Sequence, residues 1–360
     1  MNQLVENSTE LLKKLIATPS FSEKENKSAQ ILQDFFEDQN IPIERHKNNI
    51  WATNKYFDTN KPTILLNSHH DTVKPNSGYS RDPFTPVIED GKLFGLGSND
   101  AGGPLTSLIA TFIHFYEQKD LTYNLIFAAS AEEEISGDGG LVSILNKIPK
   151  IDCAIIGEPT QMHMAVAEKG LMVLDCTAKG VSGHVAHNEG ENAIFKAMKD
   201  IEWFRNYEFP EESQTLGPVK MTVSKIKAGE KHNMVPDTCG YTVDVRSTDI
   251  YTNQDILKLI RKHVYSSIHP RSTRLNSSSI PLDHPIVESG TALGLEQYGS
   301  PTLSDQALLS VPSLKIGPGN SARSHTADEF IRLDEIEKGI EIYIQLLDSA
   351  ITNNQSTDNK

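Results

Sequence analysis

The first part of the chain carries short apolar runs that predict a buried sheet. Three continuous runs lie at 63–67, 124–130 and 151–157, and each is bounded by polar or turn residues, as is typical of central strands. Between the first two runs, large apolar residues three or four positions apart predict a helix over about 102–116. This alternation predicts a three-layer α/β fold, in which a mostly parallel or mixed sheet is flanked by helices.

Helical patterns also occur near both ends of the chain. Ser20 and Glu23 have the spacing of a capping box, and the apolar residues after them predict a helix over 22–39. Apolar positions recur every three or four residues between 333 and 347 and predict a C-terminal helix. The last residues, 351–360, are polar, and we expect them to form a flexible tail.

Near residue 171 the hydrophobic pattern changes to one of period two. Apolar and polar residues alternate in "LMVLDCTAKG", "VKMTVSKIKAG" and "TCGYTVDVRS", which is typical of a half-exposed antiparallel sheet. Helical patterns at about 191–206 and 253–265 complete a β-α-β-β-α order. We therefore predict a small α+β (ferredoxin-like) domain at 171–275, inserted into a discontinuous catalytic domain of 1–170 and 276–350.

Composition narrows the choice of partners and compartment. The chain has 360 residues, of which 34 are basic and 48 acidic, so its net charge of −14 disfavours nucleic acid and anionic membranes. A small molecule or peptide is the better partner. The three cysteines are far apart and lie in apolar runs, which indicates buried thiols in a reducing compartment. Without a signal peptide pattern or an apolar stretch long enough to span a bilayer, a cytoplasmic location is expected.

Ionisable residues follow each of the three predicted strands. His69 and Asp71 come after the first, Glu132–Glu134 after the second and Glu158 after the third, while Asp100 lies between a glycine-rich turn and a helix. Any one of them alone could be a turn former or part of a solvated charge run. Ligands of α/β proteins bind at the carboxyl edge of the sheet, and so many acids meeting there would repel one another unless a divalent metal pair compensated them. The glycines of "GLGSNDAGG" follow no clear strand, which disfavours a nucleotide site.

A site of histidines and carboxylates suits zinc, cobalt or manganese better than calcium or magnesium. Two such ions about 3.5–4 Å apart can share a carboxylate and a water, and can polarise a carbonyl. A nearby carboxylate that binds no metal can then move a proton from the water to the leaving nitrogen. The residues therefore predict metal-assisted hydrolysis of an amide.

Six motifs carry a resemblance to a known family. They occur in the order "SHHDTVKP", "GLGSNDAGGP", "SAEEEISG", "IIGEPT", "GVSGHVAH" and "GPGNSARSHTADEFI". Together they resemble the di-zinc deacylase and exopeptidase family that includes acetylornithine deacetylase, succinyl-diaminopimelate desuccinylase, aminoacylase and tripeptidase. The resemblance spans residues 65 to 330.

The resemblance implies a site for two Zn²⁺ ions, for which Co²⁺ or Mn²⁺ can substitute. His69 and Glu158 are implied to bind one ion, Glu134 and His325 to bind the other, and Asp100 to bridge the two.

Two further roles come from the same motifs. Asp71 matches the aspartate that orients the histidine ligand, and Glu133 matches the general base. Because three glutamates are consecutive, a second register stays open, in which Glu132 is the base and Glu133 the ligand; the turn "ISGDGG" favours the first. His70 occupies a variable position and is interpreted as structural.

The inserted domain is implied to supply residues that contact the substrate. His184 matches the histidine that stabilises the oxyanion, in many members across a dimer interface, so we expect a homodimer formed through this lid. His187 lies three residues on, and two interpretations stay open for it: a role in the site, or only a surface or helix-entry histidine. Asn233 and Arg246 match positions near the substrate α-carboxylate, although Arg246 could instead form a salt bridge at a strand end. Lys169-Gly170 is expected to act as a hinge.

Among family members, the chain looks most like the acetylornithine deacetylase branch of arginine biosynthesis. This implies that it removes the acetyl group from N2-acetylornithine or acetylcitrulline, with Ser304 and Asp305 near the cationic end of the substrate. A desuccinylase stays open because Arg323 could hold a second carboxylate, and a di- or tripeptidase stays open as well. A metal-free binding protein is disfavoured because all the ligand and base positions hold competent side chains.

Overall fold

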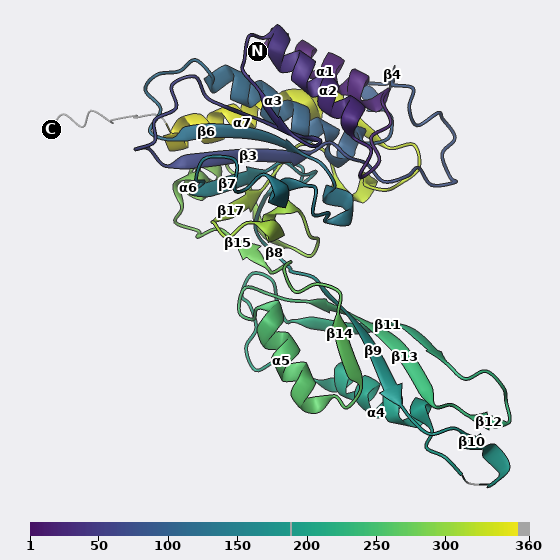
Figure 1. Ribbon diagram of the computed structural model, residues 1–360. Coiled ribbons are helices and arrows are strands. Elements are labelled where there is room, and N and C mark those ends of the chain that lie inside the picture. The colour runs from purple at the N-terminus through teal and green to yellow at the C-terminus, as the bar shows by residue number, and fades with distance from the viewer. Residues whose placement is uncertain (188, 352–360) are drawn as a thin grey trace. The chain divides into compact units, whose positions relative to one another are not determined.

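The computed structural model describes residues 1–187 and 189–351, so all but the first residue of the predicted tail lies outside the described residues. The chain divides into two compact units. The first contains Met1–Val166, Ile280–Tyr298 and the residues from Ser304 onward, and the second contains Ala167–Ser279 and Gly299–Leu303. Figure 1 shows both units, with labels on many of their helices and strands.

A mixed sheet forms the centre of the first unit. Its strand order is β1-β2-β6-β3-β7-β17-β8-β15, with β16 also paired to β8; β15 and the last residues of β8 and β16 belong to the second unit. The strands are β1 (Glu44–His46), β2 (Asn49–Thr53), β3 (Thr63–His69), β6 (Asn124–Ser130), β7 (Cys153–Ile156), β8 (Met164–Glu168), β15 (Ser278–Ser279), β16 (Gln297–Ser300) and β17 (Ser313–Lys315). The pairs β3/β6, β3/β7 and β7/β17 are parallel, whereas β1/β2 and β2/β6 are antiparallel. The three predicted strands are confirmed as β3, β6 and β7, and the predicted mixed α/β sheet with them.

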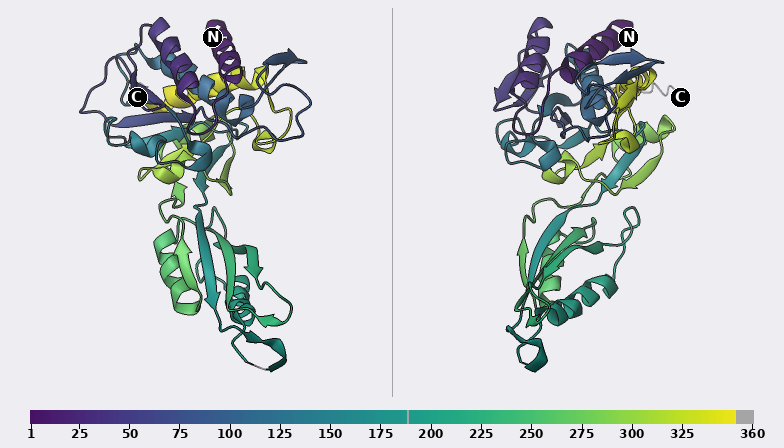
Figure 2. Two further views of the ribbon diagram at one scale, coloured as in Figure 1. Left: turned by 45° about the vertical axis from the view of Figure 1, so that its right-hand side comes forward. Right: turned by 90° about the vertical axis from the view of Figure 1, so that its right-hand side faces the viewer.

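Helices cover one face of this sheet. They are α1 (Asn2–Ile16), α2 (Asn26–Asp38), α3 (Gly103–Phe115), α6 (Pro285–Ala292) and α7 (Leu333–Ile351). Ile64 and Leu66 of β3 pack in the same core cluster as buried residues of α2, α3, α6 and α7, whereas Leu65 packs on the opposite face with the segment 141–148. Successive residues of a strand point to opposite faces, so β3 serves two apolar layers. In Figure 2, as in Figure 1, the purple N-terminal helices and the yellow C-terminal helix lie on one side of the sheet.

A smaller sheet completes the first unit, and two helices of this unit, α1 and α6, are not predicted from the sequence. The sheet has the order β18-β5-β4, from β4 (Val87–Glu89), β5 (Lys92–Phe94) and β18 (Phe330–Arg332). The buried apolar residues of α1 are Leu11, Leu12 and Ile16, which lie on one face of the helix.

The predicted capping box at Ser20 and Glu23 is wrong. The helix α2 begins at Asn26, and no side-chain cap bond closes its first turn. Glu23 instead adopts a left-handed conformation with φ 70°, and its N–H donates to the carboxylate of Glu25 at 2.7 Å. The side chain of Ser22 donates to Asp71 at 2.7 Å. The segment before α2 is therefore shaped by contacts with the edge of the sheet.

The second unit has a β-α-β-β-α-β order around a four-stranded antiparallel sheet. The sheet order is β11-β13-β9-β14, with a separate pair β10-β12. Its elements are β9 (Met172–Lys179), β10 (Gly183–His184), α4 (Ala193–Asn206), β11 (Lys220–Ala228), β12 (Met234–Val235), β13 (Thr238–Arg246), α5 (Asn253–His263) and β14 (Ser267–Pro270). The ferredoxin-like prediction is confirmed, with β14 as an additional strand. The role of this unit as a lid and dimerisation domain stays a prediction.

All three cysteines are free and buried, as their apolar surroundings predict. Within residues 1–187 and 189–351, none of the helices combines the length and hydropathy needed to cross a bilayer.

Candidate metal centre

Three parallel strands deliver the predicted ligands to one edge of the sheet. His69 is the last residue of β3 and pairs with Ser130, the last residue of β6. Glu133 and Glu134 follow β6 within four residues, and Glu158 follows the end of β7 by two. Because the strands are parallel, their carboxyl ends coincide, and the acids that follow them meet.

The two ring nitrogens of His69 have different surroundings. Nδ1 lies 3.0 Å from the main-chain oxygen of Asp71 and 3.4 Å from its carboxylate, both of which are acceptors. Nδ1 therefore carries a proton, and Nε2 faces the carboxylate of Asp100 at 3.3 Å. This is the arrangement of a histidine that offers Nε2 to a metal while a carboxylate behind it fixes the ring.

Asp100 lies between two histidines. Its Oδ1 is 3.3 Å from His69 Nε2, and its Oδ2 is 3.7 Å from His325 Nε2. The loop that carries Asp100 is held by Glu329, a buried carboxylate that accepts the N–H groups of Gly97, Asn99 and Asp100 at 2.8–3.1 Å. Since each carboxylate oxygen faces a different histidine, Asp100 has the geometry of a bridging ligand.

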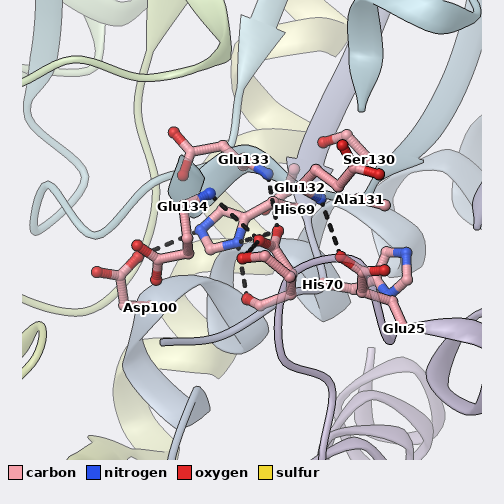
Figure 3. A network of polar contacts seen from close by, with 12 residues as sticks. Glu25, His69, His70, Asp100, Ser130, Ala131, Glu132, Glu133 and Glu134 are labelled. Carbon is pink, nitrogen blue, oxygen red and sulfur yellow. Dashed lines mark hydrogen bonds and ion pairs between the residues drawn. The ribbon is translucent and has the colours of Figure 1, made fainter. Parts of the chain in front are cut away.

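His325 and Glu134 form the second half of the cluster. The Nε2 atom of His325 is 3.0 Å from the Glu134 carboxylate. On the other side, Glu158 comes within 3.8 Å of His69 Nε2. Ligand atoms of His69, Asp100 and Glu134 lie within 4.8 Å of one another, and so do those of His69, Glu133 and Glu158. Figure 3 shows His69, Asp100 and Glu134 close together.

The carboxylates of this cluster are electrostatically unfavourable to one another. Burial, together with the charges of neighbouring acids, raises the pKa of Glu158 to about 8 and that of Glu133 well above its usual range. Desolvation alone would lower the pKa of His69, but the carboxylates of Asp100 and Asp71 raise it well above its ordinary value. Two imidazoles and four carboxylates in one small volume are a donor set that fits divalent cations of the zinc type.

The three consecutive glutamates take different positions. Glu132 has a left-handed backbone with φ 55°, and its carboxylate accepts the N–H of Gly139 at 2.8 Å. The Glu132 side chain therefore serves the turn 137–140, while Glu133 and Glu134 face the cluster. This geometry favours the register in which Glu133 is the base and Glu134 the ligand.

His70 turns away from the cluster. The hydroxyl of Ser28 lies 2.9 Å from its Nδ1, and the main-chain oxygen of Asn48 lies 2.9 Å from its Nε2. Burial lowers the pKa of His70 to about 4. A neutral ring held between a hydroxyl and a carbonyl joins β3 to the N-terminal segments, which is the structural role expected of it.

Ser304 and Asp305 lie in the interior, and their expected contact with the substrate stays a prediction. Both residues are buried. Ser304 accepts the N–H of Gln306 and caps a turn, and Asp305 accepts hydrogen bonds from Asn67 at 3.0 Å and Ser130 at 2.6 Å. An acid so enclosed joins β3 to β6 and offers no exposed charge to a cationic side chain.

Arg323, the residue that kept a desuccinylase open, already has a partner. Its guanidinium makes two hydrogen bonds to Glu335, at 2.7 and 3.0 Å, and lies over the ring of Phe330 at 4.5 Å. Both partners belong to the protein, so the arrangement does not leave Arg323 free for a second substrate carboxylate.

Residues of the second unit fall into two places. His184 in β10 pairs with Met234, the N–H of Val185 donates to the carbonyl of Asn233, and the rings of His184 and His187 are 5.0 Å apart. These residues gather beside β10 and β12.

Arg246 lies at the last position of β13 and forms a salt bridge with Asp244 at 2.8 Å, the alternative interpretation of this residue. Nearby, the N–H of Gly170 donates to Ser247. The hinge role of Lys169-Gly170 and the substrate roles of Asn233 and Arg246 stay predictions.

Four polar residues near the cluster escape the sequence analysis. Ser22, Glu25 and Asn49 lie before the first motif, and Glu329 lies inside the last one without a role. Ser22 donates a hydrogen bond to the Asp71 carboxylate, and each of the other three accepts a backbone N–H of a loop that carries predicted site residues. The only available signal is that Ser22 and Glu25 stand in a polar stretch, "SFSEKEN", in front of a helix.

Comparisons with known proteins identify the family of the chain. Residues 65–349 match the family described as peptidase family M20/M25/M40. The chain is 29% identical to acetylornithine deacetylase of Proteus mirabilis, over 97% of this chain and 98% of that protein. It is 28% identical to a probable carboxypeptidase of Paracoccidioides brasiliensis, over 98% of this chain and 87% of that protein.

A solved structure has the same fold. The dinuclear metal-binding peptidase of Bacillus subtilis from the M20 family superposes with a TM-score of 0.74 at 15% identity, over 96% of this chain and 98% of that one. The chain therefore belongs to peptidase family M20/M25/M40 and is a hydrolase of that family.

Proposed function

We propose that the protein hydrolyses the amide bond of an N-acyl amino acid, with N2-acetylornithine or N-acetylcitrulline as substrate and acetate as one product. The observation that carries this proposal is the cluster at the ends of β3, β6 and β7, where Asp100 lies between two histidines and Glu133 lies beside them. The resemblance to the acetylornithine deacetylase branch selects the acetyl group, and we place the reaction in arginine biosynthesis in the cytoplasm.

His69 and Glu158 would hold one metal ion, Glu134 and His325 the other, and Asp100 would bridge them. We propose two Zn²⁺ ions, with Co²⁺ or Mn²⁺ as substitutes. When bound, such a pair supplies Lewis acidity that activates water and polarises the amide carbonyl.

The chain's own residues supply the proton transfers and the orientation. Glu133 accepts the proton of the attacking water and delivers it to the leaving nitrogen. Its raised pKa, caused by burial and by neighbouring acids, brings the carboxylate closer to the range in which a general base works near neutral pH. Asp71 fixes the ring of His69, so that Nε2 stays aimed at the metal position.

Positions within the second unit support a homodimer. Asn233 lies beside β12, at the end of the unit where β13 begins (Figure 1), whereas Arg246 ends β13. Eight strand steps of about 3.3 Å separate the two ends of β13 by about 26 Å, more than two side chains can bridge. If both residues hold one substrate carboxylate, they come from different copies of the chain.

The surface of the same unit also supports association with a second copy. Phe195 and Met198 on α4 are 65% and 56% exposed. The neighbouring strand β11 is at an edge of its sheet, where β13 is its one partner among residues 1–187 and 189–351. An exposed apolar helix face beside an unpaired edge is typical of an interface. The resemblance then assigns His184 of such a dimer to the developing oxyanion.

Steady-state hydrolysis decides the substrate. The zinc- or cobalt-loaded protein should hydrolyse N-acetylornithine or N-acetylcitrulline with a higher kcat/KM than N-succinylornithine, N-succinyl-diaminopimelate or free di- and tripeptides. The engaged Arg323 supports acetyl over succinyl substrates. Peptidase activity is the second candidate, because a probable carboxypeptidase is about as similar as the deacetylase. A preference for peptides would replace the proposal with this candidate.

A further inference from the structure

The loop after β6 donates a continuous row of backbone hydrogen bonds to buried side chains. The N–H of Ala131 donates to Asn49 at 2.9 Å, and that of Glu132 donates to Glu25 at 3.2 Å. The next two, from Glu133 and Glu134, donate to the two carboxylate oxygens of Asp71 at 3.0 and 3.2 Å. Four consecutive backbone N–H groups thus donate to side-chain oxygens.

These hydrogen bonds hold the loop in an unfavourable backbone conformation. Glu132 has φ 55° and Ser136 has φ 48°, a left-handed conformation that side-chain-bearing residues adopt only when their surroundings impose it. The next two residues after Glu132 are the proposed base and a proposed ligand. The direction of their side chains therefore depends on the contacts that hold Glu132.

Asn49 and Glu25 are buried and hold the loop through several hydrogen bonds. Both are fully buried. Asn49 also donates from Nδ2 to the carbonyl of Gly139 at 2.7 Å, so it binds the loop at both ends. Oε1 of Glu25 accepts the N–H groups of Glu132 and Glu23, and Oε2 accepts a hydrogen bond from Asn48 Nδ2 at 2.8 Å. Figure 3 shows Glu25 in contact with the loop that carries Glu132, Glu133 and Glu134.

We propose that Asn49 and Glu25 are positioning residues of the hydrolysis: by accepting the N–H groups of Ala131 and Glu132, they set the loop that aims Glu133 and Glu134. The proposal rests on the proposed function, because it takes Glu133 as the base and Glu134 as a metal ligand. Neither residue is a proposed ligand or the proposed base, and both lie outside the range 65–349 that matches the family. Displacement of a reacting group by about 1 Å can cost about a hundredfold in rate, so loss of these acceptors should be visible in kcat.

The chain offers a matched control for a merely structural role. Asn54, which follows the last residue of β2, is buried and accepts the N–H of Leu125 at 2.9 Å. Asn49, the first residue of β2, makes the same kind of bond just beyond the other end of β6. The two asparagines thus join the same pair of strands, one at the end that leads into the site loop and one at the end away from it.

The test compares Asn49→Ala, Glu25→Ala and Asn54→Ala in the metal-loaded protein. We expect Asn49→Ala and Glu25→Ala to lower kcat for N-acetylornithine by about 10–100-fold, with KM changed by about twofold or less. Both should also change the visible absorption spectrum of the Co²⁺-loaded protein, because Glu134 moves. Asn54→Ala should lower the Tm by about as much as Asn49→Ala does. It should leave kcat and the Co²⁺ spectrum unchanged.

Conservative variants keep the proposal testable if an alanine variant does not fold. Glu25→Gln retains an oxygen for the N–H groups of Glu23 and Glu132, and should keep kcat within about fivefold of the wild type, because the lost acceptor serves only Asn48. Asn49→Asp keeps the acceptor for Ala131 and should retain more activity than Asn49→Ala.

Three outcomes would overturn the proposal: Asn49→Ala behaving like Asn54→Ala, Glu25→Gln losing as much kcat as Glu25→Ala, or a raised KM at unchanged kcat. If the wild type does not hydrolyse N-acetylornithine, the proposed substrate is wrong, and the Co²⁺ spectra of Asn49→Ala and Asn54→Ala still test the positioning role. A wild type that binds no Co²⁺ removes both proposals.

Discussion

Substitution of adjacent glutamates separates the base from its neighbour. Glu133→Gln removes the proposed proton acceptor and changes the side-chain volume very little. General acid–base catalysis contributes about 10²–10⁴-fold, so we expect kcat to fall by this factor, which corresponds to about 3–5 kcal/mol in activation free energy. The metal content should not change, because Glu133 is not a proposed ligand.

The neighbouring change, Glu132→Gln, should have little effect on the rate. The carboxylate of Glu132 accepts the N–H of Gly139 at 2.8 Å, and the glutamine carbonyl can accept the same bond. The difference between a charged and a neutral acceptor is about 1 kcal/mol of stability, so we expect a slightly lower Tm and a kcat within about fivefold of the wild type.

Both variants are measured by steady-state hydrolysis of N-acetylornithine together with metal analysis of each preparation. A large loss in Glu132→Gln with little loss in Glu133→Gln would refute the reasoning and reverse the register. Loss of one metal ion from Glu133→Gln would instead show that Glu133 is a ligand, as its closeness to His69 and Glu158 would allow.

Three further variants or conditions test other parts of the site. In Glu329→Gln, one of the two oxygens that accept N–H groups of the loop carrying Asp100 becomes an NH₂ donor. Metal affinity, measured in competition with a chelator, should therefore fall about 10–100-fold. Unchanged affinity would contradict this expectation. Arg323→Ala breaks the pair with Glu335. The ratio of acetyl to succinyl hydrolysis should stay within about threefold of the wild-type ratio, the usual scale of an indirect effect. A selective loss of succinyl hydrolysis would contradict this expectation. Burial raises the pKa of Cys153 to about 12, so its thiolate fraction at pH 8 is about 10⁻⁴ and rises tenfold per pH unit. A thiol reagent should therefore not modify native protein within minutes at pH 8 but should modify all three cysteines after denaturation, and fast native labelling would contradict the burial.

The sequence predicts the parts of this site that depend on strand ends. Continuous apolar runs identify β3, β6 and β7, and polar residues just after such runs meet at one edge whenever the strands are parallel. His69, the run Glu132–Glu134 and Glu158 are found in this way without knowledge of the loops, whereas the choice of Glu134 within the run comes from the resemblance. The order of elements in the second unit is also predicted from the sequence, because period-two alternation is a strong local signal.

Loop conformation is where the sequence fails. Asp305 follows a serine in a polar stretch and could equally face solvent or the interior; only the tertiary contacts with Asn67 and Ser130 turn it inward. The capping box at Ser20 fails because Ser22 and Glu25 bind groups at the edge of the sheet in place of the start of α2. Local spacing cannot reveal a partner that is distant in the chain.

The supporting side chains of this centre have a property that explains why motifs miss them. Glu25, Asn49 and Glu329 each accept backbone N–H groups, which every residue except proline supplies. A ligand must be a histidine or a carboxylate and so marks its own position, whereas a residue whose N–H is bound can be of almost any type. The partner of such an acceptor leaves no trace in the sequence. Motifs of this chain therefore describe the atoms that would touch a metal, and the acceptors that aim those atoms become visible only when the loops are folded.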